Sequence, residues 1–117
     1  MVRARIASFR YAFAGLWVMI RTQPNAWIHC VATLAVTSAG IHFALPARDW
    51  ALLVCAVGLV WMGEALNTAI EFLADAAVPE HHSLIKHAKD IAAAAVLLAS
   101  VAAALIGALV FAPYLPV

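Results

Sequence analysis

Apolar residues form three long blocks in this chain, at residues 26–45, 50–73 and 91–112, with short polar turns between them. Each block approaches or exceeds the roughly 20 apolar residues that a membrane-spanning helix needs. The first block has no formal charge, the third has none either, and the second contains Glu64 and Glu71. The pattern therefore predicts an all-α membrane protein with three transmembrane helices.

A further helix is predicted over about residues 3–21, where the apolar positions recur at helical spacing instead of filling the whole segment. The apolar positions are Ile6, Phe9, Phe13, Leu16, Trp17 and Ile20, and the opposite face carries Arg3, Arg10 and Arg21. This amphipathic pattern is typical of a helix that lies on the membrane surface. A signal peptide is the alternative, but no small-residue cleavage motif follows, and the segment around Pro24 reads as a turn.

Prolines mark the predicted helix boundaries. Pro24 separates the surface helix from the first span, Pro46 ends that span, and Pro79 interrupts the second loop. Ser83 is expected to cap the helix that leads into the third span. Small residues recur there at every fourth position, namely Ala95, Ala99, Ala103 and Gly107. Because such a face lets membrane helices approach closely, and three spans make a thin bundle, we expect a homo-oligomer.

Composition excludes most other classes. Of the 117 residues, 67% are hydrophobic and 11% are charged, and the mean hydropathy is +0.98. A soluble domain of this size could not hide so much apolar surface in one core. We therefore expect a single membrane-embedded domain over residues 1–117.

The small net charge of +1 conceals an uneven distribution. Four arginines lie in the first 21 residues without any acid, and Lys86 and Lys89 lie in the loop 74–90. This distribution favours a membrane surface over a nucleic acid as partner. The positive-inside rule places the N-terminus and the second loop in the cytoplasm and the C-terminus outside.

A polar stripe lies at the end of the second span. Its members, in steps of three and four residues, are Glu64, Asn67, Thr68, Glu71 and Asp75. Carboxylates in an apolar region cost a few kcal/mol, and neighbouring ones need a cation or a proton between them. Their oxygens suit Mg²⁺, Mn²⁺ or Ca²⁺, and Lys89 with Asp90 reaches the same side of the membrane. The stripe is therefore expected to hold a metal–phosphate complex beside a lipid head group.

Two other interpretations of the acidic residues are available. The acids could pair with the lysines or arginines and only fix helix packing, or they could belong to a proton or ion pathway. The acids cluster at one end of one helix, however, and His29 and His42 on another span suggest no relay. No glycine-rich phosphate loop occurs, and the spacing of the histidines at 81, 82 and 87 matches no zinc signature.

The run from Glu64 through Asn67 and Glu71 to Asp75, followed by Pro79-Glu80-His81-His82 and by Ala88-Lys89-Asp90, resembles the prokaryotic diacylglycerol kinase family, which includes the undecaprenol kinases. The similarity extends from Tyr11 to the third span. It implies a homotrimeric inner-membrane enzyme with a surface helix, three spans and active sites shared between subunits. Such enzymes move the γ-phosphoryl group of Mg-ATP onto a lipid hydroxyl.

The resemblance also implies roles for individual residues. Glu64 would be the general base that takes the proton of the lipid hydroxyl, and Glu71 would hold Mg²⁺. The residues implied to contact the nucleotide are Tyr11, Asn67, Glu80, His81, His82, Lys89 and Asp90. Gln23 and Asp75 are further candidate contacts.

Some positions depart from the family pattern. Gln23 stands where some members have a metal-binding Glu, and His81 stands where a Tyr is usual. The resemblance implies undecaprenol or diacylglycerol as the acceptor, and the loop with Pro79 and the run from Asn25 to His29 look more like the undecaprenol branch. The alternative from another class is a non-enzymatic membrane subunit whose acids are structural or ion-conducting.

Overall fold

The computed structural model describes residues 1–116, and that part of the chain is helical with short connections. The domain predicted over 1–117 thus includes one residue, Val117, outside the described part. The elements in chain order are α1 (Val2–Thr22), α2 (Pro24–His42), α3 (Ala47–Ala77), α4 (Ser83–Phe111) and the 3₁₀ turn η1 (Ala112–Tyr114). The all-α prediction is confirmed, and the helix predicted at 3–21 corresponds to α1.

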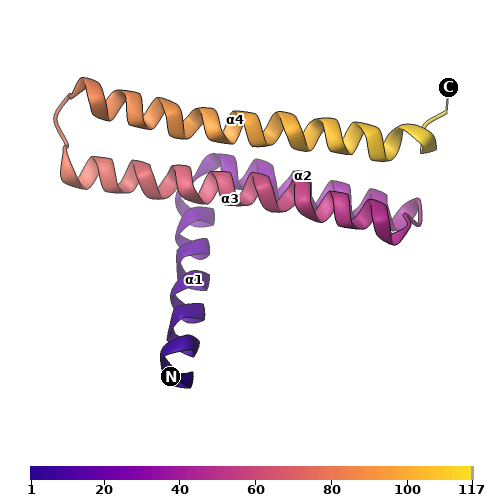
Figure 1. The fold of residues 1–117 in the computed structure, drawn as a ribbon, viewed down its shortest axis with the longest axis horizontal. Coiled ribbons are helices and arrows are strands. Elements are labelled where there is room, and N and C mark those ends of the chain that lie inside the picture. The colour runs from indigo at the N-terminus through magenta and orange to yellow at the C-terminus, as the bar shows by residue number, and fades with distance from the viewer. Residues whose placement is uncertain (117) are drawn as a thin grey trace.

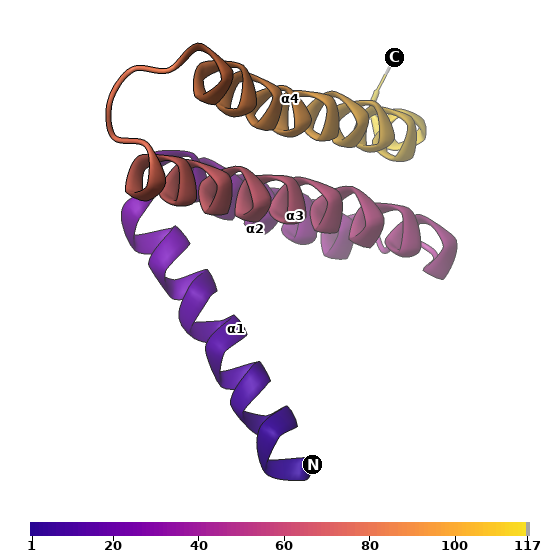
Figure 2. The same ribbon diagram turned by 60° about the vertical axis from the view of Figure 1, so that its left-hand side comes forward.

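The longest helices, α3 and α4, form an antiparallel hairpin, and α2 packs along α3 (Figures 1 and 2). Most contacts between elements join α3 to α4. The hairpin is tight near its middle, because a Cβ on Gly63 would lie 3.7 Å from the Cβ of Ala99. Part of the predicted small-residue face of α4 therefore packs against α3.

Two helices in residues 1–116 are long and apolar enough to cross a membrane, namely α3 and the stretch Ser83–Tyr114. The first predicted span corresponds to α2, which does not meet that criterion. Both long helices exceed the spans predicted at 50–73 and 91–112, because a helix can continue past the apolar segment into water. Leu97, Leu98 and Leu109 on α4 are largely exposed, as expected for a helix that faces lipid or another subunit.

Helix ends differ from two predictions and agree with a third, the boundary at Pro24. The cap of α4 is His82, whose Nδ1 accepts a hydrogen bond from the Leu84 amide at 3.1 Å, so Ser83 is the first helical residue and not the cap. Pro46 does not end the preceding helix: α2 ends at His42, and Pro46 is the N-cap of α3. Only Gln23 lies between α1 and α2. Pro24 is already in the first turn of α2, where its missing N–H costs nothing.

The apolar core lies at the end of the hairpin that is remote from the α3–α4 connection. Leu45, Leu53 and Val110 form it. Nearby, a Cβ on Gly40 would lie 2.6 Å from Cη2 of Trp50, so the indole ring packs directly over the backbone of α2 at this glycine. In contrast, α1 contacts the other helices near its C-terminal end and projects away from them as an arm (Figure 2).

Candidate functional site

Glu64 is 1% exposed and lies midway along α3. Asn67 and Thr68, one turn further along the same helix, are 8% and 4% exposed. The spacing of three and four residues turns these side chains toward the other helices, as the sequence predicted. Buried polar groups of this kind ordinarily have hydrogen-bond partners, so their partners identify the local chemistry.

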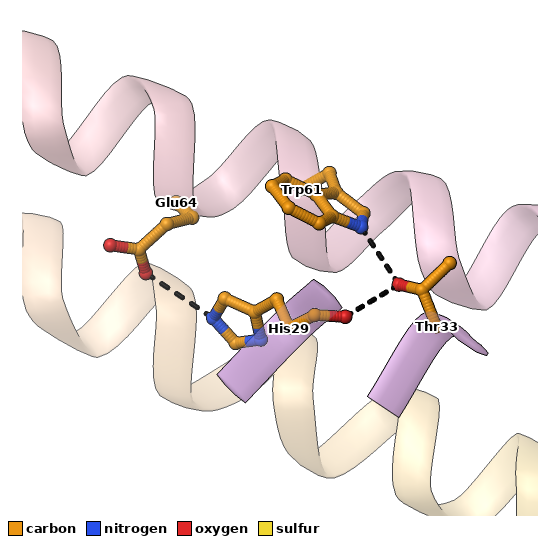
Figure 3. Close-up of polar contacts among 4 residues, drawn as sticks. All are labelled: His29, Thr33, Trp61 and Glu64. Atoms are coloured by element: carbon orange, nitrogen blue, oxygen red, sulfur yellow. Dashed lines mark hydrogen bonds and ion pairs between the residues drawn. The ribbon is translucent and has the colours of Figure 1, made fainter. Parts of the chain in front are cut away.

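His29 of α2 is the group that faces Glu64 (Figure 3). Its Nε2 lies 3.4 Å from Oε2 of Glu64, a long separation for a hydrogen bond, and both atoms are buried without another partner. The second carboxylate oxygen of Glu64 points away from the imidazole (Figure 3). His29, which the sequence did not place in the site, therefore lies beside the buried acid.

Two further side chains hold this part of α2 against α3. The Trp61 indole donates from Nε1 to Oγ1 of Thr33 at 2.9 Å, and that hydroxyl donates to the carbonyl oxygen of His29 at 2.6 Å. The rings of His29 and Trp61 also meet edge to face, with centroids 6.0 Å apart. His29 is thus packed against α3 one turn from the residue that anchors its helix.

The pair opens into a cavity of about 340 Å³ between α2, α3 and α4. Its walls comprise Asn25, Ile28, His29, Glu64, Asn67, Ala93, Val96, Leu97 and Ser100. A second, more apolar cavity of about 500 Å³ shares Ile28, His29 and Ser100 with the first and extends toward Phe111. A buried acid at the end of an apolar groove suits a long amphipathic molecule with one polar end.

The charged residues near the α3–α4 connection are arranged differently. Lys89 forms an ion pair with Asp75 across the two helices, and Lys86 bonds to Asp90 at 2.7 Å on α4. Asp75 and Asp90 are 65% and 61% exposed at the side chain. Along α3, Asp75 lies roughly 16 Å from Glu64, at 1.5 Å per residue. The structure therefore separates the predicted site into a buried level and an exposed level.

Glu71 lies between these two levels and is half-buried. Within residues 1–116, no three His, Cys, Asp or Glu side chains cluster closely enough to hold a metal ion. Asn67, one turn before Glu71, nevertheless has a buried Oδ1 without a hydrogen-bond partner. Mg²⁺ commonly takes only one or two protein oxygens and completes its shell with water and phosphate, so these two residues fit such an ion.

The remaining predicted residues are spread over exposed parts of the chain. Glu80, His81 and His82 lie at the α3–α4 connection, where His82 also caps α4. Tyr11 is 75% exposed on α1, away from the hairpin, and Gln23 is half-buried at the break before α2. One copy of the chain therefore does not gather Tyr11 with Glu64 and Lys89 around one point.

Comparisons with known proteins agree with the resemblance drawn from the motif. The family described as prokaryotic diacylglycerol kinase matches residues 10–111. An undecaprenol kinase of Bacillus subtilis is 39% identical over 92% of this chain and 88% of its own length. A diacylglycerol kinase of Synechocystis is 42% identical over 92% of this chain and 62% of its own length, and one of Escherichia coli is 44% identical over 62% and 60%.

Proposed function

The chain belongs to the prokaryotic diacylglycerol kinase family and is a lipid kinase, and from this premise we propose that it transfers the γ-phosphoryl group of Mg-ATP to the hydroxyl of a membrane lipid alcohol. One observation carries the proposal: Glu64 is a buried carboxylate that faces only His29, at 3.4 Å, and lies beside a cavity that continues into an apolar groove. The alternative of a non-enzymatic subunit is not favoured by the family membership.

The reaction needs a base, a positioned phosphate and charge neutralisation. The acceptor oxygen forms a bond to the γ-phosphorus, the bond from that phosphorus to the β–γ bridging oxygen breaks, and ADP leaves. Glu64 takes the proton of the acceptor hydroxyl, since a buried carboxylate without a cationic partner is a suitable proton acceptor. Mg²⁺, held by Glu71 and assisted by Asn67, would neutralise charge on the β- and γ-phosphate oxygens.

Lys89 is assigned to the phosphates in this proposal, with Asp90 beside it. Its side chain is 37% exposed and paired with Asp75, so Lys89 can exchange that carboxylate for a phosphate oxygen at little cost. The other proposed nucleotide contacts are Tyr11, Glu80, His81 and His82, with Gln23 and Asp75 as further candidates.

A homotrimer in the cytoplasmic membrane is part of the proposal. The arm α1 carries Tyr11 away from its own hairpin, and a second copy of the chain could supply the hairpin that Tyr11 serves (Figure 2). The proposal also includes α2 as a third span and a cytoplasmic N-terminus. In that orientation Lys86, Lys89 and the arginines of α1 lie on the side where ATP is available.

Undecaprenol is the acceptor we favour, and diacylglycerol is the other candidate. The undecaprenol kinase of Bacillus subtilis is matched over 88% of its length, whereas the two diacylglycerol kinases are matched over 62% and 60%. The apolar groove that adjoins the cavity at Glu64 has small residues, Ala103, Ala104 and Gly107, along one wall, which leaves room for a hydrocarbon chain.

The test is a phosphoryl-transfer assay on the purified full chain in mixed micelles, with γ-labelled ATP, Mg²⁺ and either undecaprenol or dioleoylglycerol. We expect label in the lipid fraction, with the higher kcat/KM for undecaprenol. Glu64→Gln is the matched control for spontaneous transfer. Label in neither lipid contradicts the kinase assignment, and a higher kcat/KM for dioleoylglycerol contradicts the preferred acceptor only.

A further inference from the structure

The geometry points to His29 as a positioning residue that fixes the carboxylate of Glu64 for proton transfer. This inference rests on the proposed function and adds a member to the site on a different helix from the acidic stripe. Figure 3 shows the imidazole of α2 directed at one oxygen of Glu64, while the other oxygen points away. The separation of Nε2 and Oε2 is 3.4 Å.

Burial makes this contact consequential. Glu64 is 1% exposed and the side chain of His29 is 14% exposed, so water is largely excluded from the space between them. An ionised carboxylate without a nearby donor is costly in such a place. Among the residues that line this cavity, Glu64 is the one carboxylate, and no lysine or arginine accompanies it in the described part of the chain. Asn25 and Ser100 also line the cavity, and His29 is the member whose ring nitrogen lies 3.4 Å from the carboxylate.

The imidazole is held in place by its own helix. Thr33 donates to the carbonyl oxygen of His29 at 2.6 Å and accepts from Trp61 at 2.9 Å, so the turn that carries His29 is tied to α3. The indole also meets the imidazole edge to face. A side chain fixed in this way loses little further entropy when it orients a neighbour.

The two carboxylate oxygens of Glu64 have different roles in this inference. In the Nε2–H tautomer, His29 donates to Oε2 of Glu64, and the remaining oxygen is free to accept the proton of the lipid hydroxyl. His29 keeps its proton throughout, and the proton taken up by Glu64 later leaves to water. The separation of 3.4 Å shortens when the acceptor closes the cavity, as catalytic hydrogen bonds commonly do.

The decisive variants are His29→Leu, which removes the donor and keeps a similar volume, and His29→Gln, which keeps an N–H donor. His29→Leu is expected to lower kcat about 10- to 100-fold, the usual loss when a partner of a functional side chain is removed. KM for ATP should change less than about twofold, because His29 lies away from the exposed level. His29→Gln should retain at least a third of the wild-type kcat by that reasoning. His42→Leu, on the same helix but exposed, is the matched control.

A second measurement tests the link between the two residues. In a Glu64→Gln background, adding His29→Leu should change the residual rate less than about twofold, because residues that act as one unit are not additive. A further loss equal to that seen in the wild type overturns the inference. Equal kcat values for His29→Leu and the wild type also overturn it.

Thermal unfolding separates positioning from simple packing. If His29→Leu lowers Tm, Thr33→Val is the variant that tests the inference. It loosens the turn that carries His29 and leaves His29 and Glu64 unchanged. That variant should lower kcat with an unchanged KM for ATP, and an unchanged kcat then overturns the inference. Failure here differs from failure of the proposed function, because an inactive wild type refutes the kinase assignment and leaves nothing for His29 to position.

Discussion

Polar groups are buried in the middle of the α3–α4 hairpin and exposed at its connected end. In the middle, Glu64 and Asn67 are buried and leave polar atoms without a hydrogen-bond partner. At the connected end, Lys89 pairs with Asp75, and all of these charges are at least partly exposed. In the same two helices, burying the first set of polar residues costs folding free energy, whereas the exposed second set costs almost none.

The magnitudes indicate which set folding alone does not explain. A buried donor or acceptor without a partner costs about 1–3 kcal/mol, whereas an exposed ion pair contributes about 0–1 kcal/mol. Folding alone gains nothing from the buried set, so a ligand is the most economical explanation for it. The exposed set needs no such explanation, although its charges remain available to phosphates.

The strongest test of this contrast is Glu64→Gln in the buried set. We expect kcat to fall by about 10²- to 10⁴-fold, the usual contribution of a general base. Tm should stay equal or rise, because a neutral amide is easier to bury than a carboxylate. Lipid phosphorylation and thermal unfolding measure the two effects, and wild-type turnover by this variant would remove Glu64 from the role of base.

A smaller effect is expected at the intermediate level, for Glu71→Gln. An amide is a weaker ligand for Mg²⁺ than a carboxylate, so the Mg²⁺ concentration for half-maximal activity should rise roughly tenfold or more. The control is Asp49→Asn in the first turn of α3, outside the acidic stripe, titrated in the same way. An unchanged Mg²⁺ titration for Glu71→Gln would exclude this residue from metal binding.

The smallest effect belongs to the exposed level. Asp75→Asn should change the free energy of unfolding by less than about 1 kcal/mol, because its ion pair with Lys89 is solvated. KM for ATP should change less than about fivefold by the same argument. Denaturation and steady-state kinetics measure both quantities, with Lys86→Gln as the matched control on the neighbouring pair. A loss of stability as large as that of a buried pair would abolish the contrast between the two levels.

The sequence predicted the helices well because long apolar blocks leave few alternatives. It also predicted that Glu64, Asn67 and Thr68 share a buried face, since their spacing follows one helix. Helix ends were predicted less well: the cap at His82 and the start of α3 at Pro46 depend on local backbone geometry. The assignment of Asp75 to the same level as Glu64 was too coarse, because a stripe on one face still extends along the helix axis.

His29 shows what a pattern within one helix cannot reveal. It lies on α2, and its contact with Glu64 depends on how two helices pack and in which register. A lone histidine in an apolar block was the available signal, and it carries no information about its neighbour. The pairing becomes visible only when Thr33 and Trp61 fix the register between the helices.

The hairpin also has consequences for how the protein is made. Its contacts begin beside the short α3–α4 connection, where Asp75 and Lys89 are 14 residues apart, and extend outward through Gly63 toward the apolar core. The two helices can therefore begin to pair soon after α4 leaves the ribosome, because the first contacts close only a short loop. Pairing can then extend from the connected end toward the core. In this order, Asp75 pairs with Lys89 before α4 covers Glu64. Glu64 then need not face lipid on the α4 side when α3 enters the membrane.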